Sequence, residues 1–300
     1  MPGPRDVLVP MFIGMLLDVV LLGTLAIQVI SYFHNYSRDR WWFKCLVVYL
    51  MVTELANTLC DILTVYEPLV ANYGTIFTGS PRLLPADAIT TTLVSTAVQL
   101  FMAWRIGILM GSVIPKLIIT AMSIVSAVGA VWLASGVITV VGTNFRQSKT
   151  IRDASYMWLI SSSVTDVTIT LCIIFVYVKR VLNHRASGSS ITDTQVSRVL
   201  RLSIESGTIT ALATISDLIV FLSVHTGPYF FIWDFALSKL YTNSLLASLN
   251  ARPTHTSLEL EPKAMLFIDD PTFSCSSDDP SKRNTVVFEC PFVLKNTQRH

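Results

Sequence analysis

Seven apolar stretches, each about as long as a helix that crosses a bilayer, occupy most of the first 250 residues. A membrane-spanning helix needs about 20 consecutive, mostly apolar residues. The stretches cover residues 7–33, 42–66, 88–110, 117–141, 154–178, 200–224 and 229–249. We therefore predict an all-α membrane protein that folds as a seven-transmembrane helix bundle.

Composition supports a membrane protein and argues against a soluble one. Hydrophobic residues make up 52% of the chain, charged residues make up 14%, and the mean hydropathy is +0.56. A soluble domain carries about 25% charged residues. The lipid bilayer is thus the expected environment. A net charge of +2 gives no reason to expect a nucleic-acid partner.

Lysine and arginine predict the orientation of the bundle, because cytoplasmic loops carry an excess of both. The loops on one side hold ten basic residues between Arg38 and Arg201, and the loops on the other side hold five between Arg5 and Arg152. This places the N-terminus outside. Residues 1–6 become a short extracellular segment, and residues 7–250 become the transmembrane domain. We expect the plasma membrane, with an internal membrane as the alternative.

The last fifty residues differ from the rest of the chain. Residues 251–300 are polar and show no sustained helical or strand periodicity, so we predict a disordered cytoplasmic tail. The fifth loop, which contains Lys179, Arg180 and a Ser/Gly stretch at 186–190, is expected on the same side. The tail and this loop are the expected places for a cytoplasmic partner.

Polar side chains within the apolar stretches are the sharpest functional signal. An ionisable group costs about 2.5–3.5 kcal/mol at the centre of a bilayer, so these groups are expected to face one another or water. Glu54, Asn57 and Asp61 lie at i, i+3 and i+7 and share one helix face. The residues predicted to form an intramembrane polar network or cavity are Asp18, Glu54, Asn57, Asp61, Gln99, Asp166, Asp217, Asp234, Lys239 and Asn243.

Two interpretations of this set stay open. In the first it is a structural network, in which Lys239 pairs with an acid and the amides fasten neighbouring helices. In the second it lines a binding cavity for a polar or cationic solute, or an ion path.

We expect no cofactor, no metal site and no catalytic activity. Lys239 suggests a Schiff base with retinal, but the third helix offers Thr92, Thr96 and Gln99 where a neutralising acid would be needed, and Asp87 is expected at the mouth of the bundle. The five cysteines show no CxxC spacing. The histidines fall in predicted loops or the tail, so a Ser–His pair or a zinc cage is not expected inside the bundle.

Three segments resemble the motifs of one family. Residues 98–106 (VQLFMAWRI) resemble a VQxFFAxRI-like signature, residues 238–252 (SKLYTNSLLASLNAR) resemble its closing segment, and residues 204–207 (IESG) are similar to its ETG motif. Together they resemble a family of seven-helix membrane proteins of mushroom-forming fungi that is filed as a domain of unknown function. The resemblance covers roughly residues 8–252 and implies the seven-helix fold, but no activity.

One position departs from that family. Its second helix often reads Asp-x-x-His, and this chain has Glu54 and Asn57 at the matching positions. A proton relay through that pair is therefore not expected here.

The first functional hypothesis is a receptor-like protein that senses a small external ligand through a polar cavity. The alternative is a transporter or channel for a small cation through the acid-lined interior, and the third hypothesis is a scaffold without a ligand.

Overall fold

The computed structural model describes residues 4–71, 83–139, 148–187, 191–223 and 229–252. In this part of the chain every regular element is helical, which confirms the predicted all-α fold. The elements are α1 (Pro4–Asn35), α2 (Trp41–Tyr66), the short π-helical turn η1 (Glu67–Ala71), α3 (Leu84–Met110), α4 (Val113–Thr139), α5 (Lys149–Ser187), α6 (Ile191–Ser223) and α7 (Phe231–Asn250). Residues 253–300 lie outside the described residues, and with them almost all of the predicted tail.

The helices are longer than their apolar stretches. The third begins at Leu84 rather than residue 88, and α5 and α6 extend into the polar segment around Ser187 and Ile191. Hydropathy marks only the apolar part of a helix, and backbone hydrogen bonding continues beyond it. Pro85 lies in the first turn of α3, where its missing N–H has no intrahelical partner to lose.

The turn between α3 and α4 is very short. Gly111 ends α3 with a φ of 63°, a left-handed conformation that glycine adopts with little cost. Only Gly111 and Ser112 separate the two helices. They therefore fold back on each other and pack side by side.

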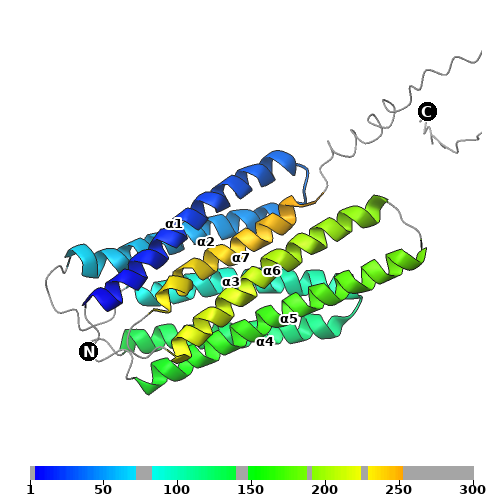
Figure 1. Cartoon of the computed structure of the whole chain (residues 1–300). Coiled ribbons are helices and arrows are strands. Elements are labelled where there is room, and N and C mark those ends of the chain that lie inside the picture. Colours follow the sequence, from blue (N-terminus) through cyan, green and yellow to red (C-terminus); the bar gives the residue numbers. More distant parts are fainter. Residues whose placement is uncertain (1–3, 72–82, 140–147, 188–190, 224–228, 253–300) are drawn as a thin grey trace, which may run out of the picture. The chain divides into compact units, whose positions relative to one another are not determined.

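The first and last helices run parallel. The Asn243 side-chain amide donates to the carbonyl of Leu21 at 3.2 Å, and that of Asn250 donates to the carbonyl of Gln28 at 2.9 Å, so the residue numbers rise together. Consecutive helices run in opposite directions (Figure 1). We call the end where α1 and α7 begin the N-terminal end of the bundle, and the other the C-terminal end.

The last helix, α7, is the most enclosed. It packs against α1, α2, α3 and α6, and buried residues occur along its whole length, from Phe231 to Leu249. The same helices therefore shield the polar groups of α7, including Lys239.

Within the described residues, six helices, α1 to α6, are long and apolar enough to cross a membrane. These helices identify a membrane protein. Helix α7 is less apolar than these six helices. Its enclosure by other helices explains the difference. A helix that meets protein on most sides does not need the lipid-facing residues that raise mean hydropathy. Seven crossings and the outward N-terminus stay predictions.

Small residues allow close helix contacts at two places. A Cβ added at Gly14 of α1 would lie 2.3 Å from the carbonyl oxygen of Phe231, and one at Gly129 of α4 would lie 2.8 Å from the backbone nitrogen of Trp158. Both separations are too short for a real carbon atom. The helix pairs α1–α7 and α4–α5 therefore depend on glycine at these positions.

A cluster at the C-terminal end, which we call the latch, consists of Tyr36, Asp39, Phe43 and Arg252. The guanidinium of Arg252 pairs with Asp39 at 2.5 Å and stands over the rings of Tyr36 and Phe43. The Tyr36 hydroxyl donates to the carbonyls of Asn250 and Arg252. Burial raises the pKa of the Tyr36 phenol above its ordinary value of 10.0, so the donor stays protonated. The α1–α2 connection thus holds the end of α7.

We expect Asp39→Asn to lower the free energy of unfolding by about 1 kcal/mol, because the Arg252–Asp39 pair is only 21–27% exposed. Arg252→Gln should cost about the same, and the double variant should cost less than the sum. The matched control is Glu205→Gln, which breaks the exposed Arg201–Glu205 pair and should cost no more than about 0.5 kcal/mol. Chemical unfolding in detergent measures all four. Equal costs for the two pairs would contradict the latch.

Candidate functional site

The structure buries every predicted site residue except Asn243, which is half-buried. They come from α1, α2, α3, α5, α6 and α7, and they separate into three groups. One surrounds Lys239, one surrounds Asp166, and one consists of acids toward the N-terminal end of the bundle.

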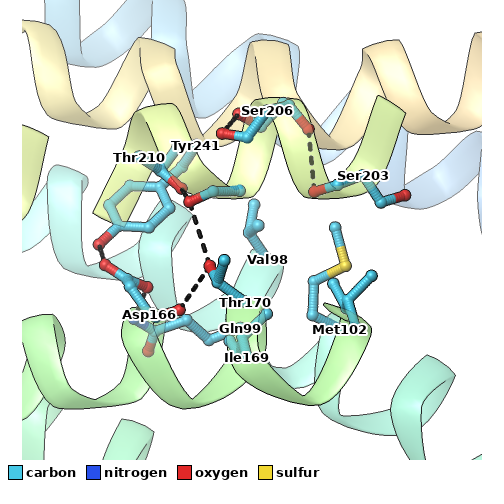
Figure 2. Close-up of a pocket in the computed structure, with 13 residues that line it drawn as sticks. Val98, Gln99, Met102, Asp166, Ile169, Thr170, Ser203, Ser206, Thr210 and Tyr241 are labelled. Atoms are coloured by element: carbon cyan, nitrogen blue, oxygen red, sulfur yellow. Dashed lines mark hydrogen bonds between the residues drawn. The ribbon is translucent and has the colours of Figure 1, made fainter. Parts of the chain in front are cut away.

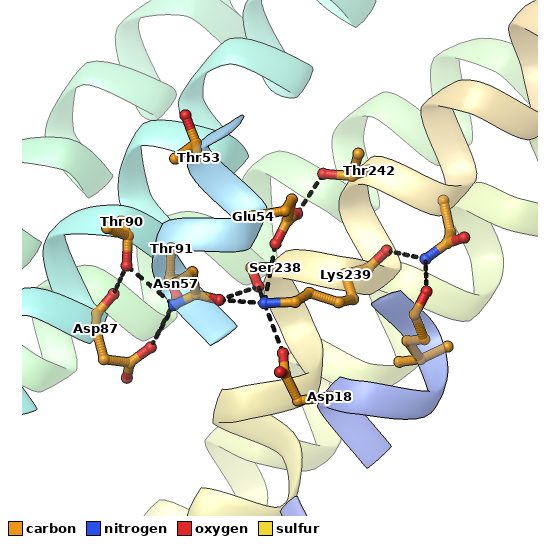
Figure 3. A network of polar contacts seen from close by, with 12 residues as sticks. Asp18, Thr53, Glu54, Asn57, Asp87, Thr90, Thr91, Ser238, Lys239 and Thr242 are labelled. Carbon is orange, nitrogen blue, oxygen red and sulfur yellow. Dashed lines mark hydrogen bonds and ion pairs between the residues drawn. The ribbon is translucent and has the colours of Figure 1, made fainter. Parts of the chain in front are cut away.

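Lys239 of α7 is held by partners from two other helices, α1 and α2. Its ammonium lies 2.6 Å from a carboxylate oxygen of Asp18 on α1 and 3.0 Å from one of Glu54 on α2. It also donates to the side-chain oxygen of Asn57 at 2.6 Å (Figure 3). The side chains of Lys239, Asp18 and Glu54 have no exposed surface. Such a charge group is stable out of water only while its partners remain in place.

Hydrogen bonds from neighbouring residues fix these partners. Thr242 donates to Glu54 at 2.5 Å, and Ser238 donates to the side-chain oxygen of Asn57 at 2.7 Å. The amide nitrogen of Asn57 donates in the other direction, to Asp87 at 2.9 Å (Figure 3). Asn57 therefore connects the Lys239 group with the acids beyond it.

Asp87 is a site residue that was not predicted from the sequence. It was expected at the mouth of the bundle, but it lies in the first turn of α3 with 1% of its surface exposed. Its carboxyl group lies near that of Asp61 on α2. Two buried carboxylates that lie near each other repel, and a proton bound by either of them would relieve this repulsion. The signal that was available is the pattern of Asp87, Thr91 and Ser95, which share one face at helical spacing.

Two further acids lie in the same electrostatic environment. Asp234 of α7 lies close enough to Asp87 and Asp217 for electrostatic repulsion between their carboxylates. Within the described residues, the carboxyl oxygens of Asp217 have no hydrogen-bond partner, and one of Asp234 also has none. A buried carboxylate without a partner is unfavourable, so a bound proton or cation would stabilise these groups.

The second group lies between α3, α5, α6 and α7. Gln99 donates to one carboxyl oxygen of Asp166 at 3.0 Å, and the Tyr241 hydroxyl donates to the other (Figure 2). Ser162 bonds to the same Tyr241 hydroxyl at 3.1 Å. Gln99, Asp166 and Tyr241 border a cavity with about 20 Å³ of space, which is enough for one water molecule.

The C-terminal half of the bundle is mainly apolar. Met102 and Ile106 of α3 pack in one core with Leu245, Leu246 and Leu249 of α7. Polar contact here includes the buried pair Ser203–Ser248, to which Arg105 donates. The acids and Lys239 therefore occupy the middle and the N-terminal half.

The described residues contain no group of three or more His, Cys, Asp or Glu side chains that could hold a metal ion. Cys45, Cys60 and Cys172 are free thiols. Cys275 and Cys290 lie outside the described residues.

Comparison with known proteins adds one finding. Residues 162–254 match the model of a family of unknown function, DUF6534. The match includes Asp166, Asp217, Asp234 and Lys239, and leaves out the partners of Lys239 on α1 and α2. No curated protein and no solved structure matches the chain. The fold and the match together define a helical membrane protein, one segment of which is similar to that family.

Proposed function

We propose that this chain is a seven-span, receptor-like membrane protein that senses a small cation, the proton included, through the acids in the N-terminal half of its bundle. In this proposal the N-terminus lies outside, and the protein acts without catalysis in the plasma membrane. The observation that carries the proposal is the excess of buried acid over buried base.

The excess is large. The acids are Asp18, Glu54, Asp61, Asp87, Asp217 and Asp234, each at most 6% exposed. Lys239 forms ion pairs with two of them, Asp18 and Glu54. One ammonium neutralises one carboxylate, so the remaining acids need protons or cations. The number of bound cations then depends on the solution that reaches this end.

The size of the interior supports a small ligand. The Asp166 cavity has room for about one water molecule, whereas sites for drug-sized molecules have volumes of about 300–1,000 Å³. A proton or a bare monovalent ion fits this cavity, and a drug-sized organic ligand does not.

The same acids support the alternative, a transporter or channel for a small cation. The apolar core of Met102, Ile106, Leu245 and Leu246 supports sensing instead. An ion that reached Asp61 would meet this core before the C-terminal end, and crossing it without polar ligands is unfavourable.

In the receptor-like proposal, cation binding at the acids alters the position of α7, and α7 transmits this change to the cytoplasmic side. Lys239 joins α7 to α1 and α2, and the latch at Arg252 lies where α7 ends. The fifth loop and the tail are the proposed contacts of a cytoplasmic partner. Most of the side chains in that loop, and residues 253–300, lie outside what the structure describes.

The test uses the full chain in lipid nanodiscs. Thermal unfolding is measured from pH 5 to 8 with Na⁺, K⁺ or choline, and hydrogen exchange of residues 183–200 is followed in parallel. A bound cation at 100 times its Kd stabilises the protein by about 2.7 kcal/mol. We expect one of these cations to raise the unfolding temperature and change the exchange. Asp61→Asn and Asp234→Asn should abolish both effects, whereas Glu205→Gln, at an exposed acid, should keep them. No response to any cation would refute the proposal.

Flux into proteoliposomes separates the two hypotheses. We expect no uptake of protons, Na⁺ or K⁺ above that of empty vesicles. Uptake that Glu54→Gln abolishes and Glu205→Gln leaves intact would replace the receptor-like proposal with the transporter.

A further inference from the structure

A second cavity lies away from the acids, between the last turn of α3 and the polar end of α5. It has about 150 Å³ of space, and its lining consists of Leu109, Met110, Phe175, Val176, Lys179 and Arg180. It therefore combines an apolar wall with two adjacent cations.

The two cations have no counter-charge in the described part of the chain. The ion pairs found there belong to Arg201, Lys239 and Arg252. Lys179 is exposed and Arg180 is half-buried. Two neighbouring positive groups beside a hollow attract an anion, and a phosphate group accepts hydrogen bonds from both an ammonium and a guanidinium.

The apolar wall indicates what carries that phosphate. Phe175 is 57% exposed, and Val176 below it is buried. Free phosphate would leave Phe175, Leu109 and Met110 uncovered. An acyl chain would cover them while its headgroup lies at the cations.

The depth of the cavity agrees with a lipid. The apolar segment of α3 ends at Met110, and that of α5 ends at Leu182, just past the two cations. Lys179 and Arg180 thus lie where a membrane-spanning segment meets the headgroups, and long basic side chains extend toward that layer.

We propose that this cavity is a binding site for an anionic phospholipid. The phosphate lies between Lys179 and Arg180, and one acyl chain runs along Leu109, Met110 and Phe175. The cavity lies on the side of the bundle that has the larger number of basic loop residues, which is the predicted cytoplasmic side. Anionic lipids are concentrated in that leaflet of a plasma membrane.

The experiment counts retained lipids by native mass spectrometry of the full chain, extracted from vesicles of equal phosphatidylserine and phosphatidylcholine. We expect wild type to retain phosphatidylserine preferentially. Lys179→Gln with Arg180→Gln should lower that preference roughly thirtyfold, since each basic residue near a membrane surface contributes about a factor of five. The matched control is Lys149→Gln with Arg152→Gln, which removes two exposed cations from the other end of α5 and should keep the preference.

Two further arms distinguish the lipid from its headgroup and from a folding defect. Phe175→Ala should weaken lipid retention, and millimolar inorganic phosphate should not displace the lipid. Unfolding temperatures identify any variant that fails to fold. If the Lys179/Arg180 double variant fails to fold, the effect of Phe175→Ala on lipid retention tests the proposal in its place. Equal retention of both lipids by wild type, equal loss in the control variant, or displacement by inorganic phosphate would each overturn the proposal.

Discussion

Replacing Lys239 by methionine lowers the free energy of unfolding by about 3–5 kcal/mol, the cost of leaving buried charge without its partner. The ammonium of Lys239 lies between Asp18 and Glu54, and none of these side chains is exposed. Without it, two carboxylates face each other in a dry interior. Unfolding in mixed detergent micelles, followed by circular dichroism, measures the loss.

A rescue variant distinguishes this cause from a packing defect. Asp18→Asn and Glu54→Gln together with Lys239→Met remove all three charges, and we expect most of the stability to return. The control Lys149→Met removes an exposed lysine from the first turn of α5 and should cost less than about 0.5 kcal/mol. If Lys239→Met alone stayed within 1 kcal/mol of wild type, the central role of this charge group would be wrong.

Gly14→Ala has the next largest expected effect, a loss of about 2–3 kcal/mol. The added carbon would lie 2.3 Å from the carbonyl oxygen of Phe231 and 3.2 Å from its carbon, both backbone atoms that cannot rotate away. Helix α1 would have to move away from α7. Since Asp18 lies one turn beyond Gly14, the same movement would lengthen its contact with Lys239.

Gly23→Ala on the same helix is the matched control. A Cβ there meets nothing within 4 Å, and alanine favours a helix over glycine by about 1 kcal/mol. We expect this variant to be as stable as wild type or slightly more stable. Similar losses at Gly14 and Gly23 would mean that helix propensity, rather than the α1–α7 contact, decides the outcome.

The sequence predicted the helices well because the apolar stretches are long. Burial of Glu54, Asn57 and Asp61 on one face of α2 also follows from their spacing. Asp87 was missed for a physical reason. Hydropathy placed the start of the third helix at residue 88, just after Asp87, whereas the helix begins at Leu84 and accommodates Pro85 in its first turn.

The partners of Lys239 could not be derived from the sequence. Asp18 lies 221 residues away, and its contact depends on the register between α1 and α7, which the Gly14–Phe231 approach helps to fix. Several acids had suitable depth, and periodicity alone does not say which helices are neighbours. Composition predicts which part of a helix faces lipid. Which buried residues become partners depends on how the helices pack, and the sequence pattern does not give that packing.

The enclosure of α7 bears on how the protein is made. Among the described helices α7 is synthesised after the other six, and it lacks their apolarity, so the bilayer alone would hold it weakly. Until it arrives, Asp18 and Glu54 have no lysine between them. We expect the nascent chain to wait as an open intermediate that quality-control factors can recognise, and to become resistant to degradation only when α7 packs against the other helices.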